Sequence, residues 1–333
     1  MSGGRNGGLG NAAGGGRSNA VGSGPGNGRN NAAGRLLRRG LRSGLPPGRP
    51  WRAGAPSGWT GRVRFLLGRP GLALSLLLLA LVLLAAVAPG LFTGRDPLTG
   101  VPADKLLAPS VHHPFGTDQL GRDLFARTVH GSSASLRAAG LAVGIALFAG
   151  SAVGLLAGAL RGWVDVVLTR CTDVLLSIPA LLLSLAVVTA LGFGTVKVAL
   201  AVGLTSVAGF ARLMRAEVLR VRAADYVEAA HSLGVRRHAV VLRHVLPNAW
   251  GPVLVFAAVE FGTVLLAVSA LSFLGYGAEP PQPEWGALVA DGRDYLATAW
   301  WLTTLPGLTI AATVLAANRI ARALEREEEA SVR

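Results

Sequence analysis

Residues 226–234 read YVEAAHSLG and, together with Leu246-Pro247, form a polar, helix-patterned insert between two long apolar segments. Asp225 lies where an N-cap would stand, and Glu228 follows three residues later in a capping-box arrangement. Four apolar residues recur at helical spacing on one side: Tyr226, Ala229, Ala230 and Leu233. Gly234 comes where a left-handed residue ends a helix. The pattern predicts a helix of about two turns, too short to be stable alone in water, so its apolar stripe requires a partner surface.

The spacing of Glu228-Ala229-Ala230, Gly234 and Leu246-Pro247 resembles the EAA loop of ABC importer permeases. In that family the loop is a cytoplasmic coupling helix that docks into a cleft of the ATP-hydrolysing subunit, and many members have Ile where this chain has His244. The residues alone also permit an ordinary capped surface helix that Gly234 simply ends. By resemblance, the residues that couple to the ATPase are Glu228, Ala229, Ala230, Leu233, Gly234, Leu246 and Pro247.

Three further motifs occur in order along the chain. They are the segment His113–Arg127 leading to Gly131 and Ser135-Leu136, the run Leu271–Gly275, and Pro280-Pro281 with Trp285-Gly286. Together they resemble the C-type subunit of dipeptide and oligopeptide importers. The resemblance implies the transmembrane domain of a type I ABC importer, with short peptides as substrates. It also implies a homologous second permease subunit, two ABC ATPase subunits and an extracytoplasmic solute-binding protein as partners.

The composition is that of a membrane protein crossing the bilayer several times. The 333 residues are 51% hydrophobic and only 15% charged, with a mean hydropathy of +0.48, which is too apolar for an ordinary soluble domain. Runs of about 20 apolar residues are long enough to cross the hydrocarbon core. They predict an all-α integral membrane protein with six transmembrane helices, at about 71–92, 136–160, 174–193, 195–211, 251–274 and 298–318. Between the second and third spans, 161–173 is expected to be a charged link.

The distribution of charge predicts the orientation. The insert at 212–248 holds seven Arg against three acidic residues, a net charge of +4, whereas the loop at 275–298 holds one Arg against four acidic residues, a net charge of −3. Because basic loops stay inside, the insert and both termini are expected to be cytoplasmic in a bacterial cytoplasmic membrane.

Residues 1–60 are rich in Gly, Asn, Arg and Ser and predict a disordered cytoplasmic tail, which we expect to be dispensable for transport. Residues 1–70 carry 12 Arg and no Asp, Glu or Lys. Without aromatic interleaving, this charge favours membrane lipid over nucleic acid as the partner. The remaining expected divisions are a first span with an extracytoplasmic segment at 61–134, a permease core at 135–320 and a C-terminal tail at 321–333.

The sequence lacks the common catalytic motifs. There is no phosphate-binding G-x-x-x-x-G-K-[ST] loop, and the two lysines, Lys105 and Lys197, follow Asp and Val. G-x-S-x-G and H-E-x-x-H are also missing. The side chains of His112-His113 point apart, so no metal site is expected. We therefore expect no enzyme activity and no cofactor in this chain, with ATP and Mg²⁺ used by the partner ATPase subunits.

Glu260 is an acid well inside a span, and intramembrane acids usually face a cavity or a partner. It is equally compatible with a place on the substrate path and with a contact to a sister subunit. The C-type subunits of peptide importers often have an acidic residue where this chain has Val268. A substrate-binding carboxylate therefore cannot be carried over from that family to this position.

The extracytoplasmic face is expected to receive the binding protein. Leu120, Leu124 and Phe125 lie near helical spacing and predict a short amphipathic helix along the membrane interface. Three acids of the following loop are candidate rim charges for docking: Glu279, Glu284 and Asp291. The alternative is that 116–127 only packs against the helix bundle and seals it.

Other functions remain open at this point. Import of nickel, glutathione or a metallophore is possible within the related families. A secondary transporter would use Glu260 as an ion relay, but such folds usually show inverted repeats and several intramembrane polar residues. A membrane-embedded enzyme is disfavoured by the missing catalytic motifs.

Overall fold

The structure is a computed structural model that describes residues 70–160 and 162–332. Within these ranges the chain is helical, and its one isolated β-bridge joins Thr117 to Asp123. The tail expected over 1–60 lies outside the described residues.

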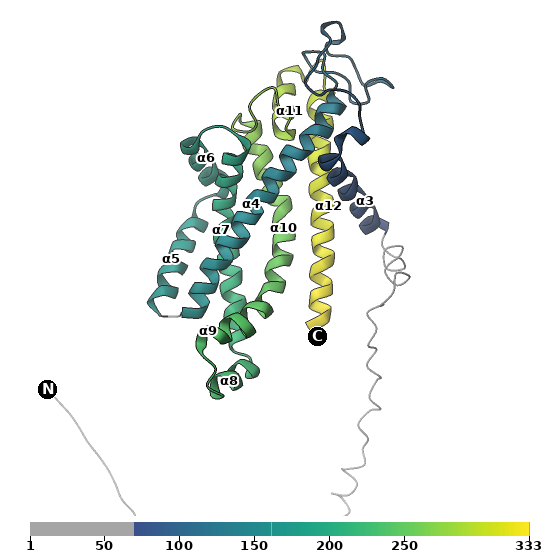
Figure 1. The fold of residues 1–333 in the computed structure, drawn as a ribbon. Helices are drawn as coiled ribbons and strands as arrows, with labels where there is room; N and C mark the ends of the chain where they lie inside the picture. The colour runs from purple at the N-terminus through teal and green to yellow at the C-terminus, as the bar shows by residue number, and fades with distance from the viewer. Residues whose placement is uncertain (1–69, 161, 333) are drawn as a thin grey trace, which may run out of the picture. The chain divides into compact units, whose positions relative to one another are not determined.

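Five helices are long and apolar enough to cross a membrane, and they run side by side (Figure 1). They are α3 (Pro70–Val87), α4 (Leu124–Leu160), α7 (Thr195–Arg222), α10 (Leu246–Phe273) and α12 (Trp301–Val332). The third expected span, 174–193, corresponds to part of a bent pair, α5 (Trp163–Ser177) and α6 (Ala180–Leu191). The prediction of an all-α membrane fold with six spans is confirmed when this pair is counted as one broken span.

The bent pair departs from the expected boundaries. The two helices meet at 95° around Ile178-Pro179, and Ile178 has the extended backbone that residues before proline prefer. The charged link expected over 161–173 is wrong, because most of it is helical in α5. Its two acids face α7, where Arg215 Nε lies 2.5 Å from Asp165 and Arg212 lies 3.1 Å from Asp173.

Glycine allows α4 and α7 to approach closely. A Cβ atom on Gly154 would lie 2.3 Å from the Ala211 carbonyl oxygen, and Gly150 and Gly158 are crowded by α7 in the same way. Glycine at every fourth position, 150, 154 and 158, thus gives a GxxxG-type ridge along which the two helices meet. In contrast, a Cβ on Gly140 or Gly144 would meet no described atom within 4 Å.

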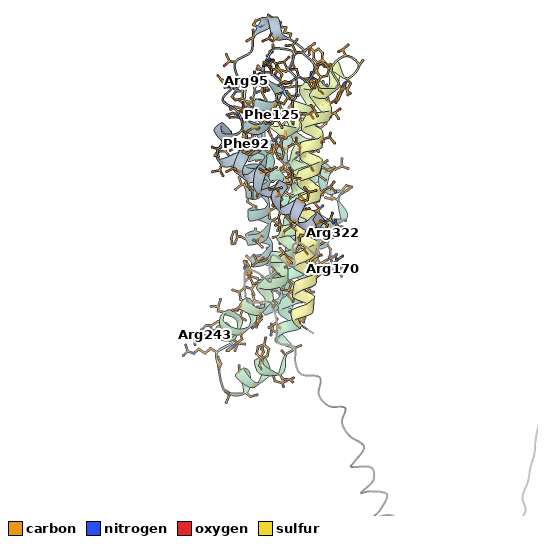
Figure 2. The ribbon with its side chains drawn as sticks, turned by 90° about the vertical axis from the view of Figure 1, so that its right-hand side faces the viewer. Phe92, Arg95, Phe125, Arg170, Arg243 and Arg322 are labelled. Carbon is orange, nitrogen blue, oxygen red and sulfur yellow. The ribbon has the colours of Figure 1, made fainter. Side chains whose placement is uncertain are left out.

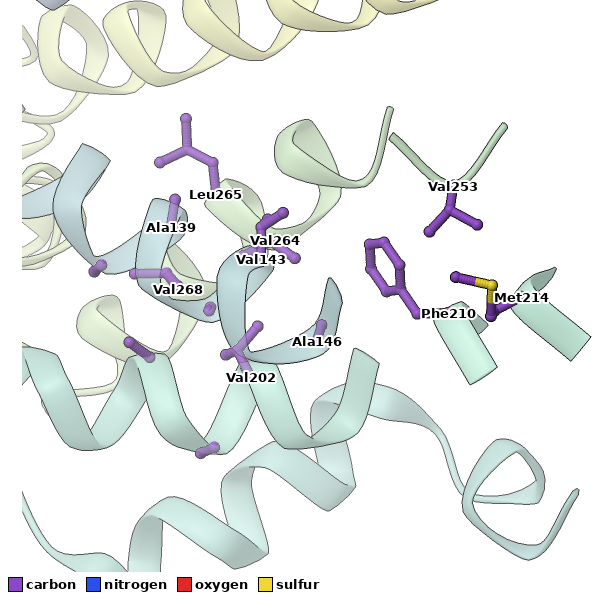
Figure 3. Packing of buried hydrophobic residues seen from close by; sticks show 14 of the residues in the cluster. Ala139, Val143, Ala146, Val202, Phe210, Met214, Val253, Val264, Leu265 and Val268 are labelled. Carbon is purple, nitrogen blue, oxygen red and sulfur yellow. The ribbon is translucent and has the colours of Figure 1, made fainter. Parts of the chain in front are cut away.

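The core between these helices is aliphatic, with one aromatic pair. Phe210 and Met214 of α7 pack near Val253 of α10, and Val143 of α4 lies beside Val264 (Figure 3). Phe210 also meets Phe256 edge to face, with ring centroids 4.9 Å apart.

Short helices occupy opposite ends of the bundle (Figure 1). At one end lie α8 (Asp225–Ser232) and α9 (Arg237–Val240), with a π-helical turn (Val241–Val245) leading into α10. At the other end lie α11 (Trp285–Gly292) and the irregular segment before α4. We refer to these as the α8 end and the α11 end.

Several expected boundaries fall inside helices. The insert expected from residue 212 begins later, because α7 continues to Arg222. The divisions placed at 134/135 and 320/321 lie within α4 and α12, so neither is a break in the described fold.

Candidate functional site

The expected helix of the insert is present as α8, but its cap differs from the prediction. The backbone amides of Val227 and Glu228 both donate to the Ala224 carbonyl, at 2.9 and 3.3 Å. Asp225 is therefore the first helical residue and Ala224 stands at the cap. The capping box expected from Asp225 and Glu228 is wrong, since the helix starts one residue earlier than the box requires.

The end of α8 follows the sequence prediction. Gly234 has a φ of +79°, in the left-handed region that favours glycine. The Val235 amide donates to the Ala230 carbonyl at 3.2 Å, which is the long-range bond of a Schellman C-cap. Val235 and Ala230 both pack against the core, so this cap also fixes the direction in which the chain leaves the helix.

The apolar stripe of α8 divides into an anchor and an exposed face. Val227 is only 1% exposed and packs into the core with Ala230. Leu233 is 85% exposed and Tyr226 49%, and Ala229 is exposed beside them. Sequence spacing missed Val227 as the anchor, although it is the one β-branched residue of the helix. The described chain thus leaves an apolar face on a two-turn helix uncovered.

The second half of the motif starts α10. Leu246 is half-buried against the core, and Pro247 follows at the start of α10, directly after the π-helical turn Val241–Val245. Val245 is fully buried just before them and, with Val227 and Val240, attaches the insert to the bundle.

At the α11 end, the motifs that are separate in the sequence meet around Trp285. Its indole Nε1 donates to the Thr128 carbonyl at 2.9 Å, and its backbone amide donates to Ser135 Oγ at 3.1 Å. Gly131 lies against the same indole, where a Cβ would be 3.4 Å from Cδ1. The motif residues of α4 and α11 are therefore packing partners.

Glu284 is not a rim charge, and that prediction is wrong. Its side chain is 1% exposed and accepts hydrogen bonds from the Ser272 hydroxyl at 2.6 Å and from the Ala278 amide at 2.7 Å. Burial raises the pKa of the Glu284 carboxyl, and the bonds from Ser272 and Ala278 oppose part of that rise. Glu284 instead joins the end of α10 to the start of α11.

The segment before α4 is not the expected amphipathic helix. It folds as turns closed by the Thr117–Asp123 bridge, and only Leu124 and Phe125 belong to a helix, the first turn of α4. Phe125 lies edge to face with Phe115, with ring centroids 5.2 Å apart. Most of 116–127 is buried, which agrees with the alternative that it seals the bundle.

Buried ion pairs hold this segment in place. Arg122 Nε lies 2.6 Å from Asp118 Oδ2, and Arg127 Nε lies 3.6 Å from the same oxygen. His113 and Arg95 both contact Asp123, at 2.9 and 2.6 Å, so His113 serves in an ion-pair cluster. Among the described residues no three His, Cys, Asp or Glu side chains are grouped as metal ligands would be.

The other two candidate rim acids are accessible. Glu279 is exposed and lines a hollow of about 760 Å³ together with His130 and Arg137. Asp291 is 47% exposed and lies 3.8 Å from the buried Arg127. Partial burial raises the pKa of the Asp291 carboxyl, while the positive charge of Arg127 opposes the rise.

Glu260 lies about midway along α10 and is half-buried. Its Oε1 accepts a hydrogen bond of 3.3 Å from the Ser206 hydroxyl of α7. The contact joins two helices of the core, and within the described residues the other carboxylate oxygen of Glu260 has no hydrogen-bond partner.

Residues 150–329 match the family described as binding-protein-dependent transport system inner membrane component. The chain belongs to that family. The matched region contains the whole insert and α8, so the fold observed here is the transmembrane domain of a type I ABC importer, a multi-pass inner membrane component.

Similar proteins include dipeptide transport permeases. The chain is 37% identical over 245 residues to the dipeptide transport system permease protein DppC of Alkalihalophilus pseudofirmus, covering 74% of this chain and 80% of the relative. It is 38% identical over 256 residues to the probable D,D-dipeptide transport system permease protein DdpC of Escherichia coli, covering 77% and 86%. It is 40% identical over 210 residues to the glutathione transport system permease protein GsiD of Pectobacterium atrosepticum, covering 63% and 70%.

Among solved structures, the MetNI methionine ABC transporter in inward-facing conformations is similar at 18% identity with a TM-score of 0.48, covering 60% of this chain and 96% of the other.

Proposed function

We propose that this inner membrane component is a permease subunit that carries short peptides through an ATP-driven importer. The relatives named for dipeptides, D,D-dipeptides and glutathione support this substrate class, since all three names denote short peptides or their stereochemical variants. The subunit pairs with a homologous permease, two ATPase subunits and an extracytoplasmic binding protein.

The observation that carries the proposal is the uncovered face of α8. Tyr226 and Leu233 expose large apolar surfaces on a helix whose opposite side is locked into the bundle by Val227. Exposed apolar patches at a fixed position are typical of protein interfaces. The seven coupling residues around this face, from Glu228 to Pro247, then form the contact with an ATPase cleft.

The orientation follows from charge. The basic insert supports a cytoplasmic α8 end, and the acidic loop supports an extracytoplasmic α11 end. With the bundle crossing the membrane in this sense, the chain's end after α12 is cytoplasmic. The exposed acids Glu279 and Asp291 then lie on the face that receives the binding protein.

Motion passes through rigid elements. ATP-driven closure of the ATPase subunits moves α8, and the Schellman cap and buried valines transmit that movement to α7 and α10. Glu260 of α10 is joined to α7 by the hydrogen bond from Ser206, so this contact links the two helices that would move. Hydrolysis itself belongs to the partner subunits.

The test is a pair of substitutions on the exposed face, Tyr226→Asp and Leu233→Asp. A central apolar interface residue contributes about 2 kcal/mol or more, so each change is expected to weaken ATPase association by about thirtyfold or more. Co-purification of the ATPase and peptide uptake in proteoliposomes are measured together. The thermal stability of the permease is expected to stay unchanged, because neither side chain is buried.

Val111→Asp is the matched control. Val111 is 97% exposed at the α11 end, so the same chemical change there leaves ATPase association intact. Normal association and uptake in the Leu233→Asp variant would refute the coupling role. The peptide assignment is tested separately, by identifying the ligand that the cognate binding protein carries.

A further inference from the structure

A basic groove lies between the start of α3 and the last third of α12. It has a volume of about 500 Å³ and is lined by Pro70, Gly71 and Leu72 of α3 and, on α12, by Ala323 and three arginines: Arg319, Arg322 and Arg326. Arg322 lies on α12 well away from Arg95 and Phe125, which mark the α11 end (Figure 2). The arginines recur at i, i+3 and i+7, which brings them to one face of the helix.

These arginines have no acidic partner among the described side chains. No described carboxylate lies within 4.0 Å of a nitrogen of Arg319, Arg322 or Arg326, whereas Arg95, Arg122 and Arg215 each form an ion pair. Within the described residues, Arg322 Nε donates a hydrogen bond of 3.3 Å to the Asn318 carbonyl, which has no formal negative charge to offset that of the arginine. Arg319 is exposed, and its guanidinium lies against Gly71, where a Cβ would be 2.1 Å from a terminal nitrogen.

The groove lies at the depth of a membrane interface. Arg319 follows Trp301 by 18 residues on α12, which is about 27 Å at 1.5 Å per residue. This is close to the ~30 Å thickness of a bilayer's hydrocarbon core. Trp300, which is 53% exposed just before the other end of α12, is the aromatic residue expected at the opposite interface. The start of α3 lies beside Arg319, so both helices leave the hydrocarbon at the same level.

We propose that this groove binds the phosphate headgroup of an anionic membrane lipid. Arginine forms paired hydrogen bonds to phosphate oxygens, and basic pockets between transmembrane helices at the interface select such headgroups. The preceding chain is an unsuitable occupant, because residues 1–70 carry 12 Arg and no acidic residue. The acyl chains would lie along the exposed leucines of α3, including Leu74 and Leu77.

The experiment uses the full-length chain in its purified transporter complex. Nanodiscs contain phosphatidylcholine doped with phosphatidylglycerol, and the lipid retained after detergent extraction is counted by native mass spectrometry. The native complex is expected to retain phosphatidylglycerol in preference to phosphatidylcholine. The triple variant Arg319→Gln, Arg322→Gln, Arg326→Gln is expected to lose this preference by about a hundredfold, because each arginine near a charged membrane surface contributes about fivefold.

A matched control removes the same charge elsewhere. The variant Arg170→Gln, Arg236→Gln, Arg243→Gln changes three exposed arginines that do not line the groove. It is expected to retain phosphatidylglycerol within about twofold of the native complex. Equal loss in both triple variants would overturn the proposal, because the effect would then come from net charge.

Two further outcomes decide the source of the anion. The stability of the native complex is also measured with inorganic phosphate alone. If phosphate stabilises it as well as phosphatidylglycerol does, the lipid assignment is overturned in favour of a free anion. A native complex without preference for phosphatidylglycerol over phosphatidylcholine would overturn the proposal itself. This measurement needs no variant, so it decides the proposal even where the triple variant fails to assemble.

Discussion

The Ser272 hydroxyl donates a 2.6 Å hydrogen bond to the buried Glu284 carboxylate, joining the last turn of α10 to the first residue before α11. Glu284 also accepts the Ala278 amide, so it holds the whole intervening turn. Gly277 lies so close that a Cβ there would be 2.6 Å from Glu284 Oε2. This carboxylate therefore organises the end of the bundle that we propose faces the binding protein.

Replacing Glu284 with Ala is expected to destabilise the protein by about 1–3 kcal/mol, because Ser272 and Ala278 lose their acceptor. Glu284→Gln keeps an acceptor and a similar volume and is expected to cost less. Thermal unfolding of the purified complex measures both. Equal stability of the Ala variant and the native protein would show that the contact contributes nothing.

The contribution of Glu284 to the stability of the protein is expected to decrease as pH rises. Burial raises the pKa of Glu284 above its ordinary value of 4.5, so the fold favours the protonated carboxyl. This contribution is fully present below pH 4.5 and is lost as pH rises through the folded-state pKa. As pH rises, ionisation of Glu284 is expected to lower the unfolding temperature of the native protein. The Glu284→Gln variant cannot ionise at this position, so it is expected to lack this contribution. Identical pH profiles in the two proteins would contradict the assignment.

Gly154 and Gly144 form a matched pair on α4. A Cβ on Gly154 would lie 2.3 Å from the Ala211 carbonyl oxygen, whereas a Cβ on Gly144 meets no described atom within 4 Å. Gly154→Ala is expected to destabilise by about 1–3 kcal/mol through overpacking. Gly144→Ala is expected to be neutral or to stabilise by up to about 1 kcal/mol through helix propensity. Thermal unfolding of both variants distinguishes packing from propensity.

Gly234→Val is expected to abolish coupled uptake. A Cβ at this position has open space, so the cost comes from the φ of +79°, which a β-branched residue tolerates poorly. Gly234→Asn is the control, because Asn adopts the left-handed region more readily, and it should retain most activity. Uptake is measured in proteoliposomes at matched protein content. Normal uptake by the Val variant would argue against the coupling role of this cap.

Glu279→Lys is expected to slow association of the binding protein in a salt-dependent manner, since rim charges act mainly on the association rate. Asp225→Lys makes the same change at the opposite end of the bundle and should leave this rate unchanged. Stopped-flow association with the cognate binding protein at low and high salt measures the effect. Unchanged kinetics at low salt would remove Glu279 from the rim.

Local features of the fold could be predicted from the sequence because neighbouring residues determine them. The spans follow from apolar runs, which must exceed the thickness of the bilayer. The helix at 225–232 and its stop at Gly234 follow from helical spacing and from the backbone freedom of glycine. The motifs around Trp285 and Ser135 were recognisable, but their contact was not, since 150 residues separate the two in the chain.

Burial of polar groups could only be decided by the tertiary structure. Glu279 and Glu284 look alike in an acidic loop, yet one is exposed and the other is buried against Ser272 of the preceding span. Whether a carboxylate can be buried depends on donors that the rest of the chain brings to it.

The sequence by itself determined the membrane fold, the position of α8 and its stop, since each depends on hydrophobicity or on backbone preferences within a few residues. Tertiary structure alone decided that Val227 anchors α8 while Leu233 stays exposed, and that Asp165 and Asp173 lie in a helix facing α7. The physical reason is that exposure and ion pairing depend on which distant helices pack together, and spacing along one helix carries no information about its neighbours.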